Sequence, residues 1–254
     1  MPIFQNITHS VAIVHAVLEG NSPGRVFVDD LAAPSSVFLF PEGTFFYIHG
    51  NENDAAFCRS VSALIFNEIL PNAIEKEMVL FAFTTAWRER LDTLLSEMGV
   101  IRIQRKVFDF NPEKFSDYLK RQTGLPDGLA IQPINHALAE KHPGYRSIIE
   151  QDSKRFGFCL MKGDEIVSEC SSIFVGGGEA EIDIHTDEKY QRRGYAQLVA
   201  SAFIQDCQRR GLKPNWACWP ERQASWSLAK KLGFEEKPDI PAHLWVEGMG
   251  AERE

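Results

Sequence analysis

The sequence predicts an α/β layer fold. Segments with the apolar alternation of strands are followed along the chain by segments whose apolar residues recur at helical spacing, and this succession is typical of helices packed on a sheet. The composition agrees, because 44% hydrophobic and 24% charged residues in a chain of 254 are typical of a globular protein with a buried core. The length fits one large domain or two small ones.

The first half begins with a predicted hairpin, since two short apolar runs flank the turn signal Pro41–Gly43. Helical spacing of apolar residues then predicts a helix that Asn53 or Asp54 caps and Pro71 ends. The expected elements are, in order, strands over 36–40 and 45–48, a helix over 55–70, a strand over 78–83, a helix over 87–98 and a strand over 100–110.

A domain boundary is predicted near the middle of the chain. A polar amphipathic segment over 111–122 leads into Thr123–Gly128, a cluster of turn-forming residues. We therefore expect an N-terminal α/β domain over 1–125 and a second domain over 126–254.

In the second half, the glycine run Gly176–Gly178 predicts a hairpin turn, and Gly211 and Gly233 predict helix ends. The expected elements are a strand over 129–132, helices over 135–141 and 145–152, strands over 155–161, 165–175 and 179–186, a helix over 196–210, a strand over 215–219, a helix over 222–232, and edge strands around Phe234 and over 244–246.

The formal charge of −8 has the wrong sign for a protein that binds a phosphate backbone, so we expect no nucleic-acid partner. The five cysteines lie far apart and form no C-x-x-C pair, which indicates neither a disulfide framework nor a metal site. The N-terminus lacks a basic signal-peptide region, and no apolar run approaches the roughly 18 residues of a membrane span. We therefore expect a cytoplasmic protein with no membrane partner.

The two halves contain a similar succession of segments. The helix over 55–70, the strand over 78–83 and a helix ending in Leu94–Val100 match the helix over 196–210, the strand over 215–219 and a helix ending in Leu228–Phe234. This similarity leaves two interpretations open, a distant structural repeat or ordinary helix ends followed by glycine.

The strand over 179–186 leads to a glycine-containing loop that opens the helix over 196–210. Unpaired N–H groups at such a helix start, together with the helix dipole, form a site for an anion such as a pyrophosphate. An ordinary strand-to-helix connection would show the same pattern, so the loop alone does not decide the function. The loop residues are Gln191, Arg192, Arg193, Gly194, Tyr195 and Ala196.

This loop resembles the Q/R-x-x-G-x-G/A loop of the GNAT superfamily of acetyl-CoA-dependent acyltransferases, and the flanking elements occur in that superfamily's order. Glu181–Thr186, Pro214–Cys218 and Ser225 also resemble the branch typified by zwittermicin A resistance acetyltransferases. The resemblance covers residues 128–254 well and implies a GNAT-like mixed central sheet flanked by helices. If the similarity between the halves is a structural repeat, the first half would be a degenerate GNAT-like domain. Its corresponding loop, His49–Asp54, is acidic, so we expect no coenzyme A there.

The resemblance implies acetyl-CoA as the acyl donor and no metal. The pyrophosphate would lie on the backbone of the 191–196 loop, and the pantetheine would run between the strands over 179–186 and 215–219, which should splay apart. Backbone groups of Ile184 and Thr186 would bind the pantetheine and the acetyl carbonyl. Arg222 and Ser225 would lie near the pantetheine and the thioester sulfur.

A general base is expected because an amine with a pKa near 10.4 is only about one part in a thousand neutral at pH 7. Strand alternation places Glu181, Asp183 and His185 on one face, with Ile184 and Thr186 on the other. Glu181 is the first candidate for the base, followed by Asp183 and His185. Solvated strand residues would show the same alternation.

The general acid stays unassigned, because many relatives carry a tyrosine where this chain has Ala229; Ser225 or Ser227 are the alternatives. We expect an N-acetyltransferase that moves an acetyl group to an amine of a small molecule or peptide by direct attack. The competing interpretation is an inactive acyl-CoA sensor or interaction protein. The acceptor is not readable from the sequence, and exposed strand edges are compatible with a homodimer.

Overall fold

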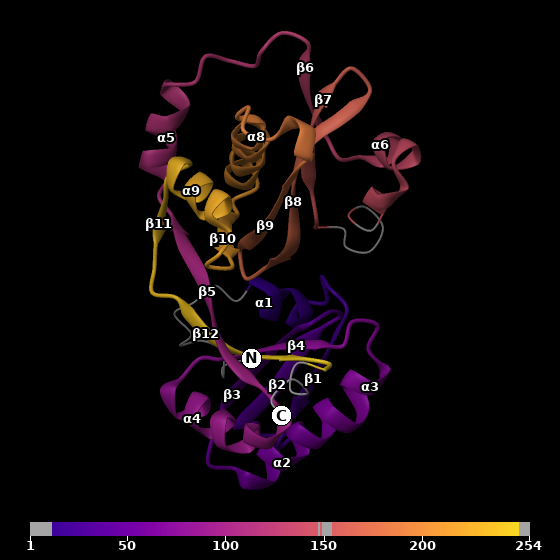
Figure 1. Ribbon diagram of the computed structural model, residues 1–254, viewed down its shortest axis with the longest axis vertical. Helices are drawn as coiled ribbons and strands as arrows, with labels where there is room; N and C mark the ends of the chain where they lie inside the picture. The colour runs from indigo at the N-terminus through magenta and orange to yellow at the C-terminus, as the bar shows by residue number, and fades with distance from the viewer. Residues whose placement is uncertain (1–11, 147, 149–153, 249–254) are drawn as a thin grey trace. The chain divides into compact units, whose positions relative to one another are not determined.

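The computed structural model describes residues 12–146, 148 and 154–248 (Figure 1). Unit 1 contains Pro23–Arg105 and residues 239–248, and unit 2 contains residues 12–22 and Lys106–Pro238. Each unit has a mixed sheet with helices packed on it, which confirms the predicted α/β fold class. The units divide the chain differently from the predicted boundary at 125/126, because each includes a segment from the opposite half of the sequence.

Unit 1 is built on one sheet whose strands follow the order β1-β2-β3-β4-β12-β5. Only β3 and β4 run parallel, and the other neighbours are antiparallel. Its strands are β1 (Gly24–Val28), β2 (Ser36–Pro41), β3 (Phe45–Gly50), β4 (Glu77–Ala82), β12 (Ile240–Val246) and the first half of β5 (Ile101–Phe110). Its helices are α2 (Ala55–Leu64), the π-helical η2 (Ile65–Ile69), α3 (Leu70–Asn72), α4 (Thr85–Leu94) and the 3-10 turn η3 (Ser96–Met98).

The start of α2 confirms Asp54 as the helix cap. Its carboxylate accepts hydrogen bonds from the backbone N–H groups of Ala56 at 3.0 Å and Phe57 at 2.9 Å. The apolar face of α2 then packs on the sheet, where Phe57 and Val61 join a core that also includes Trp87 of α4. The π-helical turn of η2 was not predicted, because the apolar spacing over 55–70 does not distinguish it from an α-helix.

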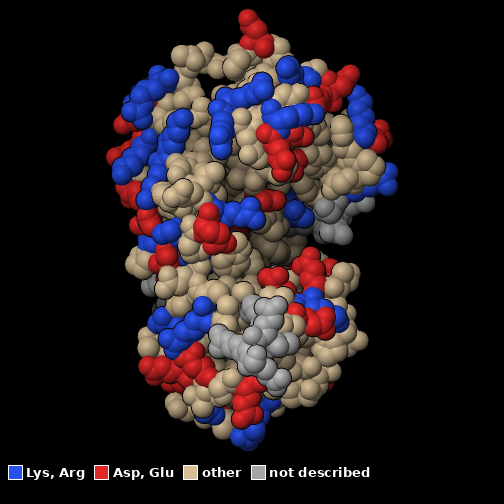
Figure 2. Space-filling model, viewed as in Figure 1, with Lys and Arg blue, Asp and Glu red and all other residues tan. Residues whose placement is uncertain are grey.

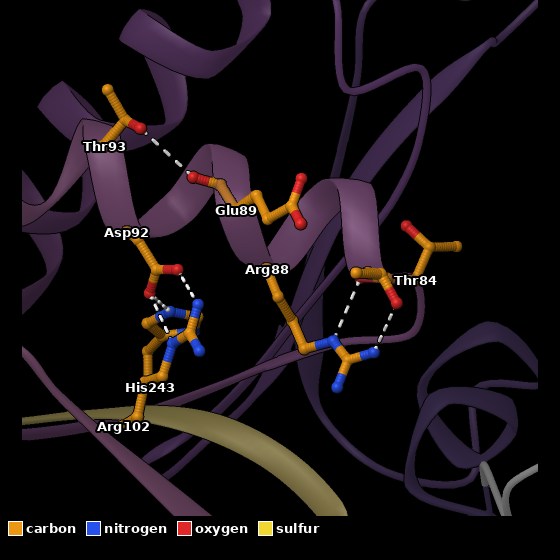
Figure 3. A network of polar contacts seen from close by, with 8 residues as sticks. Thr84, Arg88, Glu89, Asp92, Thr93, Arg102 and His243 are labelled. Atoms are coloured by element: carbon orange, nitrogen blue, oxygen red, sulfur yellow. Dashed lines mark hydrogen bonds and ion pairs between the residues drawn. The ribbon is translucent and has the colours of Figure 1, made fainter.

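Strand β12 is an interior strand of unit 1, so the expectation of a short edge strand over 244–246 is wrong. It pairs with β4 on one side and with β5 on the other. A polar contact holds it to helix α4: Nε2 of the buried His243 lies 2.9 Å from Oδ1 of Asp92, and Arg102 of β5 donates from Nε to the same oxygen at 2.8 Å (Figure 3).

Unit 2 is built on a sheet with the order β5-β10-β9-β8-β7-β6, and β11 pairs with β5. Only β9 and β10 run parallel. Besides the second half of β5, the strands are β6 (Leu129–Pro133), β7 (Gly157–Lys162), β8 (Glu165–Gly176), β9 (Glu179–Thr186), β10 (Lys213–Cys218) and β11 (Phe234–Glu236). The helices are α1 (Ala12–Leu18), α5 (Pro112–Lys120), α6 (His136–Lys141), α8 (Tyr195–Arg209) and α9 (Gln223–Lys231), with 3-10 turns η4 (Pro143–Tyr145) and η5 (Glu188–Tyr190).

Each face of the unit 2 sheet has its own core. Helix α8 packs Val199, Phe203 and Cys207 on one face, as the sequence predicts, together with Trp216 of β10. A smaller cluster beside α6 covers β7 on the other face, where Cys159 is buried. The helix predicted over 145–152 lies mostly outside the described residues.

Helix α1 was not predicted and packs against β8. A Cβ at Gly176 would lie 2.2 Å from the backbone nitrogen of Ala16, so this close approach requires glycine. Gly177 and Gly178 form the predicted hairpin turn with φ of 61° and 78°. Within the described part of the chain, no helix is long and apolar enough to cross a membrane.

The two units share one succession of elements. In unit 1, β3, α2, β4 and α4 follow one another, and in unit 2 the same succession is β9, α8, β10 and α9. The two strands within each succession pair in parallel. In both units a strand from elsewhere in the sequence pairs next to the second strand of the succession, namely β12 beside β4 and β5 beside β10.

Candidate functional site

The loop from Gln191 to Gly194 joins β9 to α8 through a backbone turn that few residue types adopt. Gly194 is the N-cap of α8, with φ of 80°. Arg192 has φ of 61° and is the one non-glycine residue with positive φ in the described part of the chain. Such a conformation costs an arginine about 1 kcal/mol, and strain of this kind is concentrated at functional sites.

The start of α8 presents unpaired backbone donors. No side chain caps this helix, and the N–H groups of residues 192–196 donate to no acceptor among the described residues. Successive N–H groups at a helix start, with the positive end of the helix dipole behind them, make a site for a phosphate or pyrophosphate. The chemistry of this donor set therefore fits the pyrophosphate of coenzyme A.

Side chains of the loop hold it in place. Gln191 donates from Nε2 to the carbonyl oxygen of Thr186 at 3.3 Å, and Arg193 donates from Nη2 to that of Lys189 at 3.2 Å. The Arg193 guanidinium also lies 5.5 Å from the ring centre of Tyr190, whose hydroxyl donates to Glu165 at 2.6 Å. Both Arg192 and Arg193 are exposed, but Arg193 makes these contacts within the loop and so stabilises it.

The strands β9 and β10 part as predicted. Their parallel pairing covers three registers and ends where Glu181 lies opposite Asn215. Beyond this point β10 pairs only with β5, and residues 182–186 of β9 pair only with β8. The edge of β9 that carries Ile184 and Thr186 thus has no strand partner on this side among the described residues, which leaves backbone groups for an extended ligand such as pantetheine.

The described part of unit 1 has neither an uncapped helix start nor parallel strands that part at the corresponding place. The parallel strands β3 and β4 stay paired up to Ile48 and Ala82, the end of β4. The helix start that corresponds to α8 is α2, and there the Asp54 carboxylate already occupies two N–H groups. A negative charge fixed at this helix start repels a phosphate, so unit 1 offers no second site of the same kind.

The candidate bases lie where strand alternation predicts. Ala180 and Ile182 are buried in the core beside α8, so Glu181, Asp183 and His185 are on the opposite face of the sheet. Glu181 is 7% exposed, whereas Asp183 and His185 are exposed. Glu181 is therefore the candidate at the point where the strands part.

Three polar residues on this face were missed by the sequence analysis. Asn215 is the register partner of Glu181 and is 8% exposed. Glu169 is the register partner of His185 and binds the Tyr145 hydroxyl. Burial and this hydrogen bond raise the pKa of Tyr145. An asparagine inside the apolar strand over 215–219 is a signal that could have identified Asn215, because asparagine is depleted in strands.

The residues predicted from α9 have different surroundings. Ser225 accepts a hydrogen bond from Nε1 of the buried Trp216 at 3.1 Å, and Arg222 is the exposed N-cap residue of α9. Ala229 is fully buried in the core.

Burial raises the pKa of the Cys159 thiol to about 11. This cysteine lies on the same face of the sheet as Glu181, and at neutral pH it is not a thiolate nucleophile.

On the surface shown in Figure 2, lysine and arginine side chains are interspersed with aspartate and glutamate side chains. Among the described residues, no group of three or more histidine, cysteine, aspartate and glutamate side chains is arranged to hold a metal ion.

Comparisons with known proteins find similarity across both units. The family model described as GNAT acetyltransferase matches residues 1–242. An uncharacterized N-acetyltransferase, YdfB of Bacillus subtilis (strain 168), is 30% identical over 231 residues, which are 87% of this chain and 85% of that protein.

Solved structures share the fold. A GCN5-related N-acetyltransferase-like protein from Streptococcus suis 89/1591 superposes with a TM-score of 0.69 and 22% identity, covering 96% of this chain and 95% of that chain. A GCN5-related N-acetyltransferase from Kribbella flavida gives a TM-score of 0.62 and 14% identity over 95% of this chain and 97% of that chain. Both similarities extend through the first half, which the sequence motifs had covered only weakly.

Proposed function

This chain belongs to the GNAT acetyltransferase family and is an acyltransferase, and from this premise we propose that it transfers an acetyl group from acetyl-CoA to an amine of a small molecule or peptide by direct attack. The observation that carries the proposal is the contrast between the two helix starts: α8 has unpaired N–H groups and no cap, whereas α2 is closed by Asp54. One donor site per chain follows, in unit 2.

The donor would be held by the backbone N–H groups of residues 192–196 and by the Arg192 guanidinium at its phosphates. Its extended arm would pair with the β9 edge at Ile184 and Thr186, which has no strand partner there among the described residues. Ser225 and Arg222 border this region from α9 in the proposal, although Ser225 already accepts a bond from Trp216.

Glu181 would act as the general base. Its carboxylate takes a proton from the acceptor ammonium, directly or through one water, and so supplies the neutral amine that the reaction needs. When bound, acetyl-CoA supplies an acyl carbon whose bond to sulfur breaks as the amine nitrogen bonds to it. The sulfur leaves as a thiolate, and the proton that the nitrogen then loses passes to this thiolate or to water. A thiol with a pKa near 8.5 is a fair leaving group, so the absence of a tyrosine at Ala229 does not prevent turnover.

Sequence motifs and the order of elements also support proposals on the branch of the family and on the origin of the first half. We place the chain near the zwittermicin A resistance-like branch on the residues Glu181–Thr186 and Pro214–Cys218. We interpret the first half as a degenerate repeat, on the succession β3-α2-β4-α4. A cytoplasmic location is supported by the five buried cysteine thiols.

Isothermal titration of acetyl-CoA tests the donor site, with Gly194→Asp as the decisive variant. An aspartate at this N-cap would place a negative charge at the start of α8, which would repel phosphate, and its Cβ would lie 2.8 Å from Nε2 of Gln197. We expect micromolar binding of one acetyl-CoA per chain, weakened at least about tenfold by Gly194→Asp, a loss of about 1.4 kcal/mol.

The matched control is Gly128→Asp. Gly128 also has positive φ, of 77°, and open space around it, but it lies in the loop before β6. This variant should bind acetyl-CoA as the wild type does. Absence of binding in the wild type, or equal loss in both variants, would refute the proposed donor site.

A further inference from the structure

The last register between β9 and β10 pairs two buried polar residues. Glu181 is 7% exposed and Asn215 is 8% exposed, and they lie opposite each other just before the strands part. Register partners of a parallel pair lie about 4.8 Å apart and project from the same face of the sheet. The two side chains are therefore neighbours at the point where β9 and β10 stop pairing, which we call the vertex.

A buried asparagine within a strand is unfavourable unless its amide has a hydrogen-bond partner. The next residue of β10, Trp216, is buried in the apolar core on the other face, so Asn215 projects from the face that carries Glu181. An amide N–H is a suitable donor to a carboxylate.

We propose that Asn215 is a positioning residue for the acyl transfer, and that its amide N–H donates to the Glu181 carboxylate and holds it at the vertex. This inference rests on the proposed function, in which Glu181 is the base. A base that must meet an amine nitrogen in one geometry gains from a fixed side chain, because small misplacements cost large factors in rate.

The hydrogen bond has a second effect, on the charge of Glu181. The titratable side chains on the same face of β8, β9 and β10 are Glu169, Glu179, Asp183, His185 and Lys213. Tyr145 is bound to Glu169, and Lys213 forms an ion pair with Asp109. Neighbouring carboxylates favour protonation of Glu181, whereas an N–H donated to its carboxylate favours the anion. Asn215 thus helps to keep the base deprotonated at neutral pH.

The experiment measures the pKa of Glu181 directly. Protein labelled with carboxyl-¹³C glutamate is titrated by NMR, and the Glu181 resonance is assigned with Glu181→Gln. We expect Asn215→Ala to raise the pKa of Glu181 by about one unit, since a hydrogen bond to a charged group is worth about that much. Asn215→Asp should raise it further by adding a like charge, and Asn215→Ser should restore part of the wild-type value.

Cys218→Ala is the matched control, because Cys218 is also 8% exposed on β10 but belongs to the core on the other face. It should leave the pKa of Glu181 unchanged. A change of less than about 0.2 units in Asn215→Ala, or an equal change in Cys218→Ala, would overturn the proposal.

Kinetics give an independent readout. We expect Asn215→Ala to lower kcat about tenfold at unchanged acetyl-CoA affinity, to move the acidic limb of the pH profile upward, and to cause no further loss in a Glu181→Gln background. An equal loss in that background would overturn the positioning role. The NMR titration needs neither donor nor acceptor. It therefore tests whether Asn215 binds the Glu181 carboxylate even if calorimetry refutes the acetyl-CoA site.

Discussion

At the scale of single residues, Glu181 is the side chain on which turnover should depend most. We expect Glu181→Gln to lower kcat at least about 100-fold with little effect on acetyl-CoA affinity, since the amide cannot accept the proton. The measurement is thiol release with a panel of amines. Asp183→Asn and His185→Gln should have smaller effects, because both residues are exposed. A larger loss in His185→Gln would assign the base to His185 instead.

Asp92 should make the stability of unit 1 depend on pH. The Arg102 hydrogen bond, supported by His243, lowers its pKa from 3.8 to about 2 against the opposing effect of burial. A lowered folded-state pKa means that the stabilisation is fully present above about pH 4 and is lost as the pH falls towards 2. The carboxylate is 33% exposed, so screening reduces the contribution to about 1 kcal/mol.

Urea unfolding of the wild type and Asp92→Asn checks this expectation. The variant should be about 1 kcal/mol less stable at pH 6, and the difference should disappear near pH 2. Asp117→Asn is the control, because Asp117 lies in unit 2 and pairs with the exposed Lys120 one helical turn away. A difference between wild type and Asp92→Asn that persists at pH 2 would contradict the assignment.

Individual residues also show how far sequence reasoning reached into the site. Gln191, Arg192, Gly194 and the alternation around Glu181 could be identified because each belongs to a local motif with a physical requirement. Asn215 and Glu169 could not, because their proximity to Glu181 and His185 depends on strand register. Register is a long-range property that local patterns leave open.

At the scale of elements, β12 should be the strand whose disruption harms unit 1 most. Ala242 pairs with Phe81 of β4 and Ile103 of β5, so its backbone lies inside the sheet. The natural Pro241 has a register partner only on β5, whereas Ala242 has strands on both sides. Ala242→Pro removes an N–H at this enclosed position, and we expect a loss of about 3 kcal/mol or more in thermal unfolding.

The control for this variant is Ala242→Gly, which keeps the N–H and should cost only about 1 kcal/mol. If the two substitutions proved equally harmful, the loss would come from packing at this buried site instead of from the ladder. Acetyl-CoA binding of the glycine variant should match the wild type, because the proposed donor site lies in unit 2.

Most elements could be predicted from the sequence. The helices α2 and α8 and the strands β5 and β9 have strong apolar periodicity and clear end signals, and the structure contains them near the expected bounds. Helix α1 and strand β1 were among those missed, because α1 has only 7 residues and β1 is a 5-residue strand that begins with glycine and arginine. The place of β12 was also wrong, because nothing local in a short apolar run shows that two other strands flank it.

At the scale of the whole molecule, the units interleave in the sequence. Unit 1 needs residues 240–246, and unit 2 needs α1 and the second half of β5. We therefore expect fragments 1–125 and 126–254, expressed separately, to lack cooperative unfolding, since each exposes sheet edges that the other fragment's residues would pair.

Mixing the fragments tests the same point. Circular dichroism and thermal melts should show structure and a cooperative transition appear only when both fragments are present. A cooperative transition in either fragment alone would support the boundary at 125/126 as a true folding boundary. The intact chain serves as the reference for full stability.

The interior position of β12 has a consequence for the order in which the protein is made. Strands β4 and β5 are complete once residue 110 is made, but β12, the strand that lies between them, is synthesised only with residues 240–246. At roughly 5–20 residues per second, these two edges stay unpaired for about 6 to 26 seconds before β12 is made. The nascent first half thus exposes unpaired β edges until residues 240–246 are made, and we expect a ribosome-associated chaperone to bind it during this interval.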